Sequence, residues 1–166
     1  AAGETSENLS YKPVMTKLLP HYKDGSYELA FPEIVNYVDA TFNTIPDKQH
    51  RAIAGLSMGG MHTLMISANY PDLFNYIGLY SAGVDFTELK MEEIPAYANL
   101  DGKLAKLAQS NPKLYWIACG NTDRLMPFNQ QLMERMTKDG LKYTFHESSR
   151  GHLWSNWRQY SLLFIP

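Results

Sequence analysis

Apolar residues recur along this chain with two different spacings. Five segments place them three or four positions apart, as on one face of a helix, and the predicted helices are residues 31–42, 58–69, 101–109, 127–138 and 152–164. Short apolar runs of strand length lie between them, and the predicted strands are residues 51–54, 75–80, 113–119 and 141–146. Pro71, Pro127 and Gly140 fall at segment boundaries, where such residues begin or end helices. The pattern therefore predicts strands that alternate with helices.

This alternation, with its short connections, predicts an α/β fold in which helices flank a mostly parallel sheet. A chain of 166 residues, of which 45% are hydrophobic and 19% charged, has the size and composition of one domain with its own core. The loops that follow parallel strands gather at one edge of the sheet, and reactive groups lie there. The reactive side chains in those loops are Ser57, Asp85, Asp123 and His152.

Residues 55–59 read G-L-S-M-G and match the pattern G-x-S-x-G between a predicted strand and a predicted helix. In that setting the pattern predicts a nucleophile elbow, a sharp turn that exposes the Ser57 hydroxyl at the end of the strand. The backbone N–H of Met58, at the start of the helix, is the expected donor to an oxyanion. A second donor normally comes from a glycine-rich loop after an early strand, and no such segment is found before residue 31.

A serine nucleophile needs a base, and that base needs a carboxylate to fix its tautomer. His152 is favoured as the base because it follows the last strand in a turn. The other histidines precede the elbow, lie on its helix or lie inside a strand, and they are His21, His50, His62 and His146. Asp123, after the third strand, is the favoured acid, and Asp85, after the second, is its rival. The order Ser57, Asp123, His152 is that of α/β-hydrolases and not that of chymotrypsin-like or subtilisin-like proteases.

Charge and hydropathy argue against two classes of partner. A net charge of -2, with basic residues scattered among acidic ones, provides no surface for nucleic acid, and no apolar run approaches the ~20 residues of a membrane span. Cys119 is the single cysteine, which excludes an internal disulfide, and its apolar neighbours indicate a buried, inert thiol. Trp154 and Trp157 follow His152 closely; they either stack on a substrate ring or pack the last helix on the sheet.

Four stretches together resemble the esterase D-like esterases, especially the feruloyl and acetyl xylan esterases of carbohydrate esterase family 1. They are residues 51–60 (RAIAGLSMGG), 70–74 (YPDLF), 120–123 (GNTD) and 151–154 (GHLW). This resemblance implies the α/β-hydrolase fold, with Ser57 as nucleophile, Asp123 as acid, His152 as base and Met58 as an oxyanion donor. It also implies that the chemistry uses no metal and no organic cofactor.

The resemblance implies hydrolysis of ester bonds, most directly those of feruloyl or acetyl groups on plant cell-wall polysaccharide. It implies a secreted or periplasmic bacterial protein, although the first thirty residues are polar and not signal-like. Alternatives that use the same triad are an acyltransferase, a thioesterase or an enzyme like the S-formylglutathione hydrolases of this superfamily. The alternative from another class is a non-catalytic remnant that binds carbohydrate or a protein partner.

Members of this family carry further N-terminal strands and the second oxyanion loop. Residues 1–166 are therefore expected to be the C-terminal part of a single catalytic domain. Four strands with their helices would leave one sheet edge unpaired and apolar surface exposed, which proteins usually avoid. We expect a companion polypeptide, the N-terminal part of the same precursor, to complete the sheet.

Overall fold

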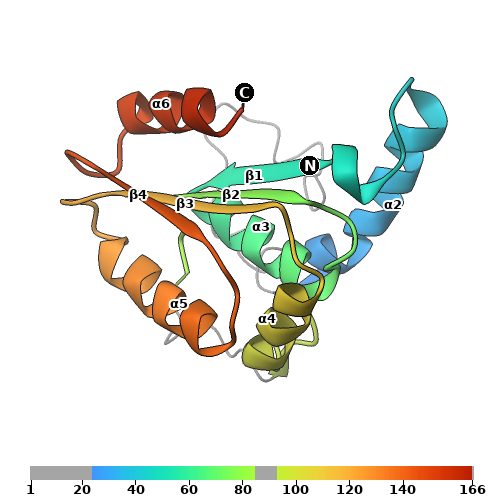
Figure 1. The fold of residues 1–166 in the computed structure, drawn as a ribbon, viewed down its shortest axis with the longest axis horizontal. Coiled ribbons are helices and arrows are strands. Elements are labelled where there is room, and N and C mark those ends of the chain that lie inside the picture. Colours follow the sequence, from blue (N-terminus) through green and yellow to red (C-terminus); the bar gives the residue numbers. More distant parts are fainter. Residues whose placement is uncertain (1–23, 85–92, 166) are drawn as a thin grey trace.

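The computed structural model describes residues 24–84 and 93–165 and contains a four-stranded parallel sheet in the order β1-β2-β3-β4 (Figure 1). The strands are β1 (Ala52–Leu56), β2 (Tyr76–Tyr80), β3 (Leu114–Gly120) and β4 (Thr144–Ser148). The predicted parallel sheet is confirmed, but β4 begins three residues later than expected. Leu141 is buried, but its N–H bonds to the Met136 carbonyl of the preceding helix at 2.9 Å. This apolar residue therefore belongs to the end of that helix and not to the strand.

Helices lie on both faces of the sheet. They are α2 (Ser26–Thr41), α3 (Met58–Asn69), α4 (Leu100–Gln109), α5 (Met126–Lys138) and α6 (Trp154–Phe164), with a short 3₁₀ helix (Lys48–His50) before β1. Among the helices of the described residues, Figure 1 shows α3, α4 and α5 on one face of the sheet, α6 on the other, and α2 beyond β1. The structure starts α2 five residues before the predicted residue 31, with Pro32 inside the helix, and the added turn buries Glu28.

Two apolar layers hold these helices on the sheet. The larger lies against α3, α4 and α5, and its fully buried side chains include Leu64, Ile77, Leu104, Ile117 and Leu132. The smaller lies under α6 and includes Trp157 together with four rings that meet edge to face, from Tyr80, Trp116, Tyr160 and Phe164. Aromatic pairs of this geometry are stabilising beyond their buried area, so α6 has a defined position over β2 and β3.

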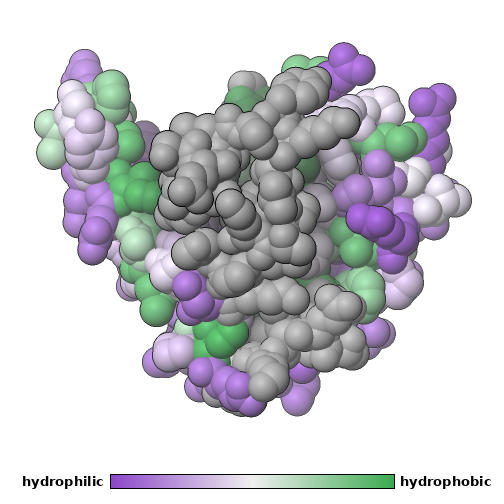
Figure 2. Space-filling view, turned by 180° about the vertical axis from the view of Figure 1, so that it is seen from behind, coloured by the Kyte–Doolittle hydropathy of each residue, from purple (hydrophilic) through white to green (hydrophobic). Residues whose placement is uncertain are grey.

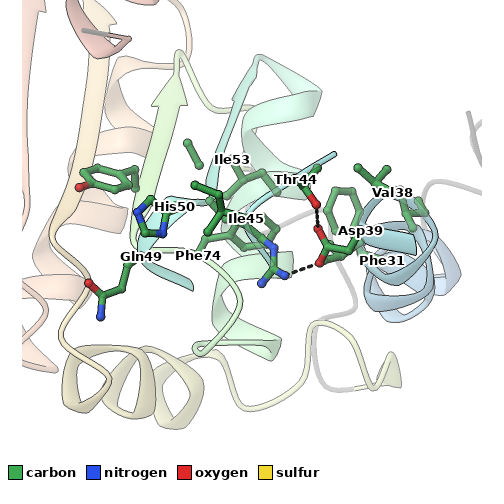
Figure 3. A pocket seen from close by; sticks show the side chains of 14 residues that line it. Phe31, Val38, Asp39, Thr44, Ile45, Gln49, His50, Ile53 and Phe74 are labelled. Atoms are coloured by element: carbon green, nitrogen blue, oxygen red, sulfur yellow. Dashed lines mark hydrogen bonds and ion pairs between the residues drawn. The ribbon is translucent and has the colours of Figure 1, made fainter. Parts of the chain in front are cut away.

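A groove of about 790 Å³ separates α2 from β1 (Figure 3). Its lining is mostly apolar, with Phe31, Ile34, Val38, Ile45 and Ile53 among its side chains. In the view from behind, α2 projects from the rest of the molecule at the left, and apolar side chains lie on it among hydrophilic ones (Figure 2). Within the described residues, β1 pairs with β2 alone. One side of β1 therefore has no strand partner in the part of the chain that the structure describes.

Candidate active site

Ser57 lies in the turn between β1 and α3, with the unusual backbone angles φ 53 and ψ -117. A residue with a side chain adopts such angles only at a cost of about 1–3 kcal/mol, and this strain is typical of a nucleophile elbow. The turn also needs small neighbours, because a Cβ at Gly55 would lie 2.1 Å from the carbonyl oxygen of Gly59. Hydrogen bonds fix it from outside: Ser57 N–H donates to Tyr80 O at 2.8 Å, and Gly83 N–H donates to Ser57 O at 2.7 Å.

The structure brings Ser57, His152 and Asp123 into one hydrogen-bonded row. Ser57 Oγ is 2.9 Å from His152 Nε2, and His152 Nδ1 is 2.9 Å and 3.1 Å from the two carboxylate oxygens of Asp123. With the imidazole proton on Nδ1, His152 donates to Asp123 and accepts from the serine hydroxyl. The Asp123 side chain is fully buried, and its carboxylate also accepts a hydrogen bond from Leu125 N–H at 2.9 Å.

The other histidines of the described residues have different partners. His50 bonds to the exposed Asp47, His62 bonds to the buried Glu28 at 2.7 Å, and His146 stacks on Trp116. His21 and Asp85, the rival acid, lie outside the described residues. His152, which the sequence favours because it follows the last strand, is therefore the one described histidine that is hydrogen-bonded to Ser57.

Met58 is the first residue of α3, so its N–H is among the helix donors that have no partner within the helix. It follows the serine directly and is oriented by the same turn, next to the positive end of the helix dipole. Within residues 24–84 and 93–165 we assign no second oxyanion donor.

The two tryptophans after His152 have different surroundings. Trp157 is buried, its ring meets the His152 imidazole edge to face at 4.7 Å, and its Nε1–H donates to Ser81 Oγ at 3.3 Å. Trp154 is 68% exposed and lies edge to face against Trp157 at 5.2 Å. The packing interpretation therefore fits Trp157, whereas Trp154 presents an open ring beside the site. The sequence pattern did not reveal that Trp157 touches the imidazole.

Cys119 is buried one residue before the end of β3. Burial raises the pKa of its thiol from 9.0 to about 12, and the nearby Asp123 carboxylate adds to the effect. The thiolate is the reactive form, so the group is inert in the folded protein. Because the unfolded chain loses this proton at lower pH than the folded chain, the thiol makes the free energy of unfolding decrease as the pH rises from about 9 to about 12.

We expect iodoacetamide at about pH 8 to leave Cys119 unmodified in the folded protein and to alkylate it completely in guanidinium chloride. Mass spectrometry of both samples measures this directly. Rapid alkylation of the native protein would contradict the burial of this thiol.

Within the described residues, no group of three or more His, Cys, Asp or Glu side chains is placed to hold a metal ion. A search of those same ranges finds no helix that is both long and apolar enough to cross a membrane.

Comparison with known proteins shows which family this chain resembles. Residues 21–161 match the family model Esterase, described as "Putative esterase". An endo-1,4-beta-xylanase/feruloyl esterase of Xylanibacter ruminicola is 46% identical over 56 residues, which are 34% of this chain and 8% of that protein. An acetyl esterase of Caldicellulosiruptor saccharolyticus is 28% identical over 157 residues, covering 77% of this chain and 58% of that protein.

Among solved structures, a ferulic acid esterase superposes with a TM-score of 0.67 at 25% identity, over 83% of this chain and 57% of that one. The chain thus spans well under two thirds of the length of these relatives. The family model covers most of the chain, and the parallel sheet with its elbow agrees with the solved fold. The chain therefore belongs to the esterase family and has the α/β-hydrolase fold.

Proposed function

We propose that this protein is a serine carboxylesterase in which Ser57, His152 and Asp123 form the catalytic triad. The observation that carries the proposal is the row of hydrogen bonds from the serine hydroxyl through the imidazole to a buried carboxylate, each about 2.9 Å long. A serine hydroxyl is a weak nucleophile until a base in this position accepts its proton. The strained backbone of Ser57 has no evident purpose in stability, which further supports a chemical role.

The proposed reaction has two halves. Ser57 Oγ attacks the ester carbonyl carbon while His152 Nε2 takes its proton, and the Met58 N–H donates to the developing oxyanion. The C–O bond to the alcohol breaks, the alcohol leaves with the proton from His152, and an acyl-enzyme remains. Water then attacks the acyl carbon with His152 again as base, and the acid and free serine are released. Asp123 holds the imidazole tautomer and stabilises its charged form throughout.

The substrate that we propose is a feruloyl or acetyl ester on plant cell-wall polysaccharide. The names of the two curated relatives support both acyl groups, since one is a feruloyl esterase and the other an acetyl esterase. The exposed ring of Trp154, linked to His152 through Trp157, offers a face for a feruloyl ring or a sugar. A polysaccharide substrate also fits a secreted or periplasmic protein, which remains part of this proposal.

Initial rates on a matched panel test this function: methyl ferulate, a xylan acetyl ester, a thioester and S-formylglutathione, each with and without a sugar acceptor. We expect hydrolysis of methyl ferulate or the acetyl ester to have the highest kcat/KM. Faster release from the thioesters, or acyl transfer to the sugar, would favour the alternatives with the same triad. Binding of xylan without any turnover would favour the non-catalytic alternative.

Replacement of Trp154 by alanine is expected to raise KM for methyl ferulate about 2- to 13-fold, the value of one aromatic contact, with little change in kcat. An acetyl ester of the same alcohol lacks the ring and should be unaffected. Leu162→Ala is the matched control, because Leu162 is also exposed on α6 but lies near its other end. Equal effects on both esters would show that Trp154 does not contact the acyl ring.

We also propose that the N-terminal part of the same precursor is a companion polypeptide that occupies the groove between α2 and β1. Two features support it: β1 pairs with only one strand among the described residues, and apolar side chains line the groove beside it. In such an arrangement residues 1–166 would be the C-terminal part of one catalytic domain, and the companion would supply further strands and the second oxyanion donor.

Native mass spectrometry of the active protein tests the companion. We expect the species with esterase activity to be heavier than the 18.9 kDa of this chain. Full activity in a sample that contains the 18.9 kDa chain alone would contradict this part of the proposal and leave the triad itself untouched.

A further inference from the structure

The turn before His152 is held by hydrogen bonds on three consecutive carbonyl groups. The Asn156 side-chain amide donates from Nδ2 to Ser149 O at 3.0 Å and to Gly151 O at 3.1 Å. Between them, Arg150 O accepts from the backbone N–H of Thr122 at 3.1 Å. Asn156 lies in the first turn of α6 and is 5% exposed, so its amide contacts the buried side of the turn.

This turn has a conformation that needs such support. Arg150 has φ 73, in the left-handed region that residues with a side chain rarely occupy. The carbonyl groups on its two sides converge on a single nitrogen atom, which brings two negative dipole ends together. An amide –NH₂ suits this arrangement because it offers two hydrogen atoms on one nitrogen. A carboxylate of the same shape has acceptors only and would repel both carbonyl groups.

The same amide lies where the loops of the acid and the base meet. A Cβ at Gly120, three residues before Asp123, would lie 2.1 Å from Arg150 O and 3.1 Å from Asn156 Nδ2. Asn121 N–H also donates to Ser148 O at 2.8 Å. The close backbone contact at Gly120 and the backbone hydrogen bonds hold the loop of Asp123 against the loop of His152. Asn156, from α6, contacts both loops at this point.

We propose that Asn156 is a positioning residue that sets the distance from His152 to Ser57 by fixing this turn. The inference rests on the proposed function of the triad and adds a residue that acts through His152 without touching substrate. If the amide is lost, the turn relaxes and His152 Nε2 moves away from its place 2.9 Å from Ser57 Oγ. Misplacement of a catalytic group by about 1 Å costs on the order of 100-fold in rate.

The test compares Asn156→Asp and Asn156→Ser with the same changes at Asn69. Asn69 is a matched control, because its Nδ2 also bridges two carbonyl groups, Met65 O and Ala96 O, each at 2.7 Å, but at the far end of α3 from Ser57. One readout is the rate at which a fluorophosphonate probe labels Ser57. The other is the far-downfield proton resonance of the His152 Nδ1–H bonded to Asp123, which a general loss of stability does not shift in a folded protein.

We expect labelling to slow about 100-fold in Asn156→Asp and about 10-fold in Asn156→Ser, with the resonance shifted or broadened in both. The Asn69 variants should stay within about threefold of the unchanged protein and keep the resonance. Should Asn156→Asp fail to fold, Asn156→Ser decides, since it places no negative charge beside the two carbonyl groups. Rates and resonances equal to those of the Asn69 variants would overturn the proposal. If the unchanged protein hydrolyses esters but is not labelled at Ser57, the triad is refuted, and the resonance then decides on Asn156 alone.

Discussion

Ser57→Ala is expected to lower kcat for ester hydrolysis by about 10⁴-fold or more, because the variant has no oxygen to attack the carbonyl carbon. KM should change little, since the serine hydroxyl adds little to ground-state binding. The fold should be retained, because alanine removes a single oxygen atom. Steady-state kinetics on the best ester of the panel measures the effect.

The matched control is Ser67→Ala in α3, the helix that follows Ser57. Ser67 is buried, and its Oγ donates to Leu64 O at 3.0 Å. We expect this control to report any loss of stability that follows from removing a serine hydroxyl, and to keep its turnover. Unchanged kcat in Ser57→Ala would refute the assignment of the nucleophile.

Asp123→Asn is the second change with a large expected effect, about 10⁴-fold in kcat by comparison with the same change in a serine protease triad. The carboxylate accepts hydrogen bonds from both His152 Nδ1–H and Leu125 N–H. An asparagine that keeps its oxygen toward Leu125 turns its –NH₂ toward His152, and the imidazole must then carry its proton on Nε2, the atom that should accept from Ser57.

Asp101→Asn is the control for this prediction. Asp101 is half-exposed on α4 and pairs with Arg135 at 3.2 Å, so it also loses a charge and an ion pair, but not at the site. We expect its kcat to stay within about threefold of the unchanged protein. If Asp123→Asn and Asp101→Asn had the same kinetics, Asp123 would not be the acid of a triad.

The residues of the candidate site could be predicted from the sequence because the patterns that place them are short and local. Gly55 is required by close backbone contact with Gly59, four residues along the chain, so this requirement of the elbow lies within a short stretch of sequence. Asp123 and His152 each follow a strand, and parallel strands bring their ends to one edge. The choice among histidines followed from this topology.

Side-chain contacts that cross between elements could not be predicted in the same way. The contact of Trp157 with His152 depends on how α6 packs over the aromatic layer, and the hydrogen bonds of Asn156 depend on the left-handed conformation of Arg150. The sequence predicts too late a start for α2, because proline is typical of the first turn of a helix, whereas Pro32 lies inside α2. In each case packing decided what local propensity left open.

The most direct test of the proposed nucleophile is to treat the purified protein with a fluorophosphonate probe and to locate the adduct by intact and peptide mass spectrometry. We expect one adduct for each 18.9 kDa chain, attached to Ser57, and none in the Ser57→Ala variant. An adduct on another residue, or an unlabelled Ser57 in a sample that hydrolyses esters, would contradict the proposed nucleophile.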